Sequence, residues 1–131
     1  MLSPIPERIL RDTLILHVPH GFDRYQHPIE AVYQVEHVHI QADNITRNVQ
    51  RQGNGQNTEV ALKGVIFVDA RYSVPLLDLE GLQEAAQKAG GVMTCQVRNR
   101  AGALSGPYEI AVVDALPDDE GNLHHYELGV T

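Results

Sequence analysis

The stretch YEIAVVDALPDDEGNLHHYELGV, residues 108–130, decides the fold class of this chain. β-branched and aromatic residues, which favour extended strands, are frequent at both of its ends. Between them, PDDEGN (117–122) collects Pro, Asp, Gly and Asn, the residues that set or tolerate the backbone angles of turns. The pattern therefore predicts a β-hairpin near the C-terminus.

Alternation of apolar and polar residues predicts further strands on the N-terminal side of this hairpin. In the predicted strand over residues 32–41 the alternation changes parity near Glu36, which indicates a β-bulge or a strand buried on both faces. Over residues 59–70 the alternation runs through the whole segment, so we expect one strand there. The expected strands are TLILHV (13–18), VYQVEHVHIQ (32–41), EVALKGVIFVDA (59–70) and MTCQVR (93–98).

One segment, DLEGLQEAAQKAGG, has the periodicity of a helix. Its apolar residues recur three and four positions apart, its acidic residues come first, and Lys88 with two glycines marks the end. The pattern predicts a short helix over about residues 78–89.

Residues 43–57 are rich in Asn, Gln, Gly and Arg and contain few apolar residues. The composition predicts a long mobile loop over about residues 43–57. Loops of this length in compact domains usually perform the function or stay disordered until a partner binds.

Together these elements predict a mainly β fold, a small antiparallel β-barrel or sandwich with one inserted helix. The length of 131 residues suits one packed core, so we expect a single domain over residues 1–131. Apolar residues make up 43% of the chain and charged residues 21%, which is ordinary for a globular protein.

The charge balance excludes a general attraction to polyanions. Ten Lys and Arg against seventeen Asp and Glu give a net charge of −7, which disfavours nucleic acids and anionic membranes as general partners. Contact with DNA would have to be local, at Arg47 and Arg51 of the polar loop or at Arg98 and Arg100, although such loop charges are usually just solvated.

Cys95 is the only cysteine, which excludes an internal disulfide and a zinc site built from several thiolates. No segment has the run of about 20 apolar residues that a membrane span needs. The N-terminal residues contain two prolines and several charges where a signal peptide would be apolar. We therefore expect a soluble protein, made inside the cell, without membrane contact.

The seven histidines leave one enzymatic alternative open. His37 and His39 would lie on the same face of a strand, as metal ligands do in β-barrel enzymes, and His124 or His125 could supply a third ligand. The other interpretation is that His37 and His39 face solvent, and that His124 and His125, being adjacent, point to opposite faces. Elemental analysis distinguishes these interpretations.

Other candidate groups have simpler explanations than catalysis. Asp118, Asp119 and Glu120 lack the alternating ligands of a calcium loop and fit an acidic turn. Cys95 is expected to be a buried thiol, and Ser73 and Ser105 lack the context of a nucleophile. We therefore predict no catalytic residue, no bound cofactor and no metal site.

Three blocks resemble the minor capsid or head-to-tail connector proteins of long-tailed bacteriophages and prophages. They are IPERIL (5–10), TEVALKGVIFVDA (58–70) with the following Ser73 and Pro75, and LHHYELGV (123–130). The resemblance implies a non-enzymatic β-barrel subunit of the virion neck, a head-completion or stopper protein. A tail-completion protein of the same junction is the alternative within this class.

What the resemblance implies about partners follows from that position. The chain would form a ring of its own copies, with a dodecamer as the candidate form, below the portal and adaptor. It would retain packaged DNA and dock the tail, after assembly in the host cytoplasm.

The polar loop then becomes the candidate interface. We expect residues 43–57 to project toward the channel or a neighbouring ring, to contact DNA or an acidic partner, and to become ordered on assembly. The residues of this hypothesis are Arg47, Arg51, Gln52 and Asn54.

Overall fold

The computed structural model describes residues 6–41, 45–50 and 57–131. Its elements in chain order are η1 (Glu7–Ile9), β1 (Asp12–Phe22), β2 (Pro28–Gln41), β3 (Ile45–Gln50), β4 (Asn57–Leu62), β5 (Gly64–Asp69), α1 (Leu79–Lys88), β6 (Thr94–Arg98), β7 (Leu104–Pro117) and β8 (Leu123–Val130).

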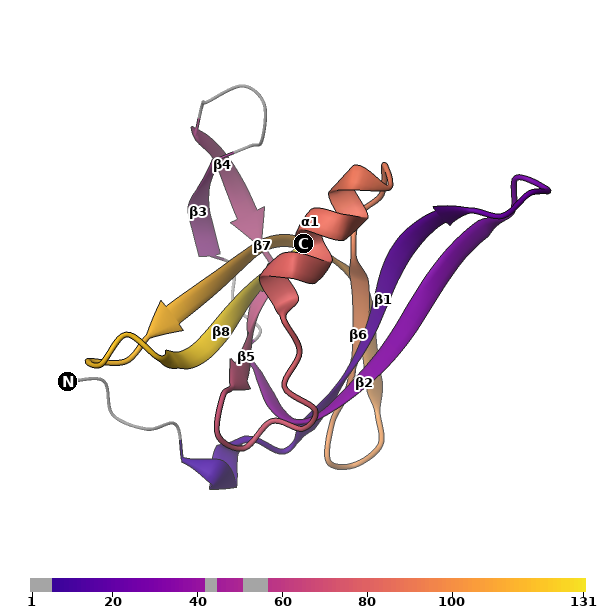
Figure 1. The fold of residues 1–131 in the computed structure, drawn as a ribbon. Coiled ribbons are helices and arrows are strands. Elements are labelled where there is room, and N and C mark those ends of the chain that lie inside the picture. Colours follow the sequence, from indigo (N-terminus) through magenta and orange to yellow (C-terminus); the bar gives the residue numbers. More distant parts are fainter. Residues whose placement is uncertain (1–5, 42–44, 51–56) are drawn as a thin grey trace.

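The C-terminal hairpin predicted from the sequence is present as β7 and β8, with Asp114 opposite Glu127. β8 also pairs with β5, so this hairpin lies within a larger sheet. Six strands follow the order β1-β2-β5-β8-β7-β6, and β6 pairs back with β1. The resulting closed antiparallel sheet with one short helix confirms the predicted fold class (Figure 1).

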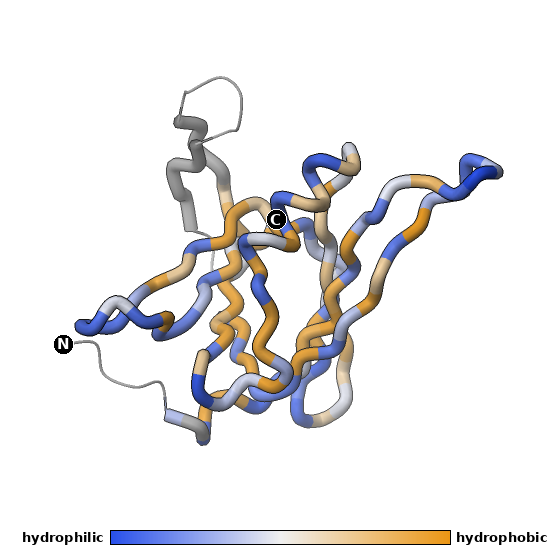
Figure 2. The backbone as a smooth tube through the Cα atoms, in the orientation of Figure 1, coloured by the Kyte–Doolittle hydropathy of each residue, from blue (hydrophilic) through white to orange (hydrophobic). Residues whose placement is uncertain are grey.

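The apolar positions of the strands form the core. Leu14, Leu16 and Val18 of β1 are fully buried, as their shared face predicts. Alternate residues of the other strands join them, and Figure 2 shows hydrophobic residues running along the central strands. Members from those strands include Val35, Val38, Ile66, Val68, Cys95, Val97, Leu128 and Val130.

The predicted helix is α1, and the structure confirms it to within a residue at each end. The carboxylate of Asp78 accepts a hydrogen bond from the backbone N–H of Gly81 at 3.1 Å and caps the N-terminus. Leu79 and Ala86 are each 1% exposed and pack in the core, where the helix contacts β1 and β7.

A β-bulge interrupts β2 where the sequence changes parity. Asp12 lies opposite Val38, but Thr13 lies opposite Glu36, so His37 is an extra residue in the pairing of β1 with β2. Its φ of 62° is unusual for a residue other than glycine. Of the two alternatives for this segment, the structure contains the bulge.

The segment expected as one strand over 59–70 consists of two. β4 pairs with β3, whereas β5 pairs with β2 and β8, and Lys63 separates them. The backbone N–H of Lys63 donates to the carbonyl of Val130 at 2.8 Å. Alternation of side chains continues through such a break, which explains why the pattern suggested a single strand.

The prediction of a mobile loop over 43–57 is wrong for much of its length. Residues 45–50 form β3, and Asn57 begins β4; the two strands form a separate two-stranded sheet. Threonine is β-branched like valine and isoleucine, so the polar composition concealed strand-forming residues such as Thr46 and Thr58.

No helix among the described residues is both long and apolar enough to cross a membrane.

Candidate functional site

Two adjoining grooves lie beside η1, where the chain enters β1. Both are wide open to solvent, with volumes of about 620 and 690 Å³. Both are lined by Arg8, Arg11, Asp12 and Arg100, and we call this combined surface the arginine groove. The remaining lining residues are Ile9, His39, Asn99 and Ala101 in one groove, and Leu10, Thr13, Glu36 and His37 in the other.

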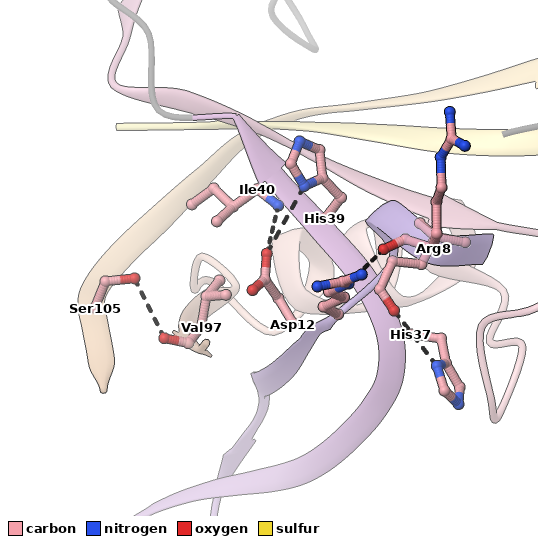
Figure 3. Close-up of polar contacts among 9 residues, drawn as sticks. Arg8, Asp12, His37, His39, Ile40, Val97 and Ser105 are labelled. Carbon is pink, nitrogen blue, oxygen red and sulfur yellow. Dashed lines mark hydrogen bonds and ion pairs between the residues drawn. The ribbon is translucent and has the colours of Figure 1, made fainter. Parts of the chain in front are cut away.

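The local fold directs the arginines outward. Leu10 is 1% exposed and anchors the segment to the core, while Arg8 and Arg11 on either side of it are exposed. The Nε of Arg11 donates to the carbonyl of Arg8 at 2.5 Å, which holds the two residues together. Figure 3 shows the guanidinium of Arg8 pointing away from Asp12.

Asp12 is turned toward β2 rather than toward these arginines (Figure 3). Its Oδ2 accepts a hydrogen bond from the backbone N–H of Ile40 at 3.1 Å and lies 3.9 Å from Nδ1 of His39. Within the described ranges, no ion pair joins Asp12 to an arginine of the groove. The groove therefore presents its guanidinium groups to solvent.

The position of these charges is informative because the chain as a whole is acidic. Three of its ten Lys and Arg side chains line one groove, on a protein with a net charge of −7. Guanidinium groups bind carboxylates and phosphates through paired hydrogen bonds. The groove can therefore bind an anion. Sequence reasoning singled out Arg100 but missed Arg8 and Arg11, which are distant from it along the chain.

A second surface is the end of the β1–β2 hairpin, which extends away from the body of the protein (Figure 1). β1 pairs with β6 only through residues 13–17, and β2 pairs with β5 only through 38–41. Residues 18–22 therefore pair only with residues 28–31, and we call residues 18–32 the projecting hairpin.

The projecting hairpin exposes large apolar side chains. Phe22 is 62% exposed, Tyr25 is 65% exposed and Val32 is 57% exposed. Its turn is nevertheless ordered, because Oδ1 of Asp23 accepts hydrogen bonds from the backbone N–H groups of Tyr25 and His27. An ordered arm with exposed apolar side chains among polar ones and with free strand edges is suited to contact with another protein chain.

The residues of the predicted interface loop are only partly described. Arg47 lies in β3 with its backbone opposite Val60. Arg51, Gln52 and Asn54 lie outside the described residues.

The histidines of the metal alternative are dispersed. The bulge turns His37 away from His39, so the expected shared face is wrong (Figure 3). His37 lies 3.4 Å from the carbonyl of Leu10, whereas the ring of His39 stacks on Phe67. In the described part of the chain, no group of three or more His, Cys, Asp or Glu is placed to hold a metal ion.

The expectation that His124 and His125 point to opposite faces is also wrong. Leu116 lies opposite His125 and Pro117 opposite Leu123, so His124 is the extra residue of a bulge that brings the two rings to one side. Their Nδ1 atoms lie 2.7 Å apart, and Nε2 of His125 lies 3.0 Å from a carboxylate oxygen of Glu127.

The candidate nucleophiles have structural roles. The Oγ of Ser73 donates to the carbonyl of His37 at 2.6 Å and accepts from the N–H of Asp69 at 2.9 Å. It thus ties the end of β5 to the bulge of β2. Cys95 is buried, and this burial raises the pKa of its thiol to about 12, which keeps it protonated and unreactive.

No family model matches the chain, and no curated protein matches it in sequence. Among solved structures, it is similar to a chain in the cryo-EM structure of the anti-feeding prophage baseplate. The match covers 100% of this chain and 93% of that one, at 11% sequence identity and a TM-score of 0.33.

Proposed function

We propose that this chain is a structural protein of the head-to-tail junction of a tailed bacteriophage or prophage. In this proposal it forms a ring below the portal and adaptor as a head-completion or stopper protein, retains packaged DNA and docks the tail. The observation that carries the proposal is the projecting hairpin. The resemblance of IPERIL, TEVALKGVIFVDA and LHHYELGV to neck proteins supplies the position in the particle.

The hairpin supports assembly for two physical reasons. Its strand edges have unpaired backbone groups that a neighbouring strand can satisfy, and its exposed Phe22, Tyr25 and Val32 gain free energy when a partner removes them from water. Isolated chains usually shorten, charge or cover such an edge. An extended arm with exposed Phe22, Tyr25 and Val32 is therefore better explained by a neighbour in an assembly.

A ring also explains how modest contacts would suffice. A head-to-tail contact between different surfaces of identical chains closes into a ring when its rotation fits. The contact that closes the ring joins two ends of one complex and is effectively intramolecular, so the closed assembly is stable even where one interface is weak.

The test is disruption of the gene in cells that produce the particles, followed by electron microscopy. We expect tails that are not joined and heads that have lost their DNA, with both defects corrected by the intact gene. DNA-filled heads without tails would instead assign the tail-completion role. Joined, infectious particles at the normal level would overturn the proposal.

A second test addresses the hairpin itself. Complementation with the double variant Phe22→Ser and Tyr25→Ser should leave heads and tails unjoined, while the chain folds normally. The matched control is Leu76→Ser with Leu104→Ser, which removes apolar side chains of 47% and 51% exposure from other surfaces. Equal complementation by both variants would contradict the role of the hairpin.

A further inference from the structure

The arginine groove is not explained by the projecting hairpin, since the two surfaces have different residues and different chemistry. Its arginines are exposed, and none of them forms an ion pair with another residue that the structure describes. Keeping like charges together on a surface costs free energy through mutual repulsion. A groove of this kind is consistent with a bound anion in the assembled protein.

The chain carries a matching anionic element in the turn between β7 and β8. Asp119 and Glu120 are exposed there. The turn is rigid because Oδ1 of Asp118 accepts hydrogen bonds from the backbone N–H groups of Glu120 and Asn122, each at 2.9 Å. A preorganised turn loses little conformational entropy on binding.

We propose that the arginine groove binds the acidic β7–β8 turn of a second copy of this chain. The turn contributes no residue to the lining of the groove in its own chain, so the contact joins two molecules. It uses different surfaces on the two molecules, which makes it a head-to-tail contact of the type that builds rings. This inference rests on the proposed function in one respect: the contact would be the interface between neighbouring subunits of the proposed ring.

The groove suits a peptide turn better than the phosphate backbone of DNA. Each groove has the volume of a small-ligand pocket, about 300–1,000 Å³, which accommodates the tip of a hairpin. Ile9, 41% exposed, and Ala101 add apolar surface that a peptide can cover.

Charge reversal on each side tests the contact. The groove variant carries Arg8→Glu, Arg11→Glu and Arg100→Glu, and the turn variant carries Asp119→Arg and Glu120→Arg. Sedimentation velocity at increasing protein concentration should show self-association of the wild type at low salt, weakened at high salt because exposed charges are screened. Each variant alone should associate at least about tenfold more weakly.

Mixing the two variants is the decisive measurement. The acidic turn of the groove variant meets the unchanged arginine groove of the turn variant, and the reversed turn meets the reversed groove. Association should therefore return to about the wild-type level in the mixture. The control is a chain with Lys63→Glu, Arg71→Glu and Lys88→Glu, which has the same change in net charge as the groove variant. Its self-association should be clearly stronger than that of the groove variant, because its groove and its acidic turn are unchanged.

The outcomes separate this inference from the proposed function. A wild-type chain that stays monomeric at about 1 mM, or a mixture that does not associate, overturns the contact but leaves the gene-disruption result unaffected. Binding of a DNA duplex in fluorescence anisotropy that is lost in the groove variant and kept in the control would also overturn it, and would assign the groove to nucleic acid.

Discussion

At the residue scale, the turn after β5 depends on Ser73. This side chain is 4% exposed, and its hydroxyl connects the backbone of Asp69 to the carbonyl of His37 in the bulge. Ser73→Ala leaves a buried N–H and a carbonyl without a partner, so the free energy of unfolding should fall by about 2 kcal/mol. Urea denaturation measures this change.

Ser105→Ala is the matched control for that prediction. The Oγ of Ser105 donates to the carbonyl of Val97 at 3.2 Å, but this serine is only half-buried and makes a single hydrogen bond. Its loss should cost about 1 kcal/mol or less. Equal losses in the two variants would contradict the role given to Ser73.

Cys95 makes stability depend on pH in alkaline solution. Burial raises the pKa of its thiol from 9.0 to about 12. Between these values the folded chain keeps the proton and the unfolded chain releases it, so the stability present below pH 9 is lost as the pH rises toward 12. Within this window the free energy of unfolding should fall by about 1.4 kcal/mol per pH unit from this residue.

Cys95→Ala isolates that contribution, because Tyr126, whose pKa is raised by burial and by Asp78, changes stability in the same direction. The variant should be less stable at neutral pH through the cavity it leaves, but its stability should decline less steeply in alkaline solution. Urea denaturation across the pH range compares the two slopes. Parallel declines would show that the thiol does not lose its proton on unfolding.

At the scale of elements, three hairpin turns share one design. Each starts with Asp23, Asn99 or Asp118, whose side-chain oxygen accepts a hydrogen bond from the N–H four residues later. The fourth residue of each turn has positive φ and is Gly102 or Gly121 in two of them, but in the β1–β2 turn it is Gln26, with φ 65°.

This difference predicts opposite effects of two substitutions. Gln26→Gly relieves a conformation that costs a residue with a Cβ roughly 1 kcal/mol, so it should stabilise the protein by about that amount. Gly121→Gln should destabilise it by a similar amount. Thermal unfolding followed by circular dichroism measures both, and a loss of stability on Gln26→Gly would contradict the shared design.

The helix and most strands of the closed sheet, but not β3, could be predicted from the sequence because side-chain periodicity and turn residues are local signals. β8 begins and ends at the predicted residues, and α1 differs by one residue at each end. The positions of His37 and His124 could not be predicted. A bulge changes which face a side chain takes, and it depends on the register with a neighbouring strand.

The candidate site was harder to predict for the same reason. The arginine groove combines residues near positions 8–12 with the β6–β7 turn, and only the closure of the sheet through β1 and β6 brings them together. Of the exposed apolar residues of the projecting hairpin, Phe22 and Tyr25 lie outside the strands that the alternation predicted, because β1 extends to Phe22 and Tyr25 lies in the turn. Whether a strand is covered by another depends on the topology, which periodicity does not contain.

At the scale of the whole molecule, the structure has two separable parts. The closed sheet contains the core cluster, and β3 and β4 form a two-stranded sheet outside it. A two-stranded sheet alone contributes little stability. Leu62, 1% exposed at the end of β4, lies beside Gly129 of β8 and should be retained in any shortened chain.

Replacing residues 47–60 with Asn-Gly should therefore shorten this hairpin without unfolding the protein. Thr46 and Ala61 remain opposite each other, and Asn-Gly suits the two-residue turn that joins such a pair. The free energy of unfolding should change by less than about 1 kcal/mol. Urea denaturation checks the stability, and a large loss would mean that the closed sheet depends on β3 and β4.

The same variant tests the predicted role of Arg47, Arg51, Gln52 and Asn54, which it removes together. If these residues contact DNA or a neighbouring ring, complementation with a folded variant should leave heads that lose DNA or do not join tails. The groove and the projecting hairpin are intact in this variant, so a defect would belong to residues 47–60 alone. Infectious particles at the wild-type level would reject the interface in this segment, while the assembly role of the projecting hairpin would still stand.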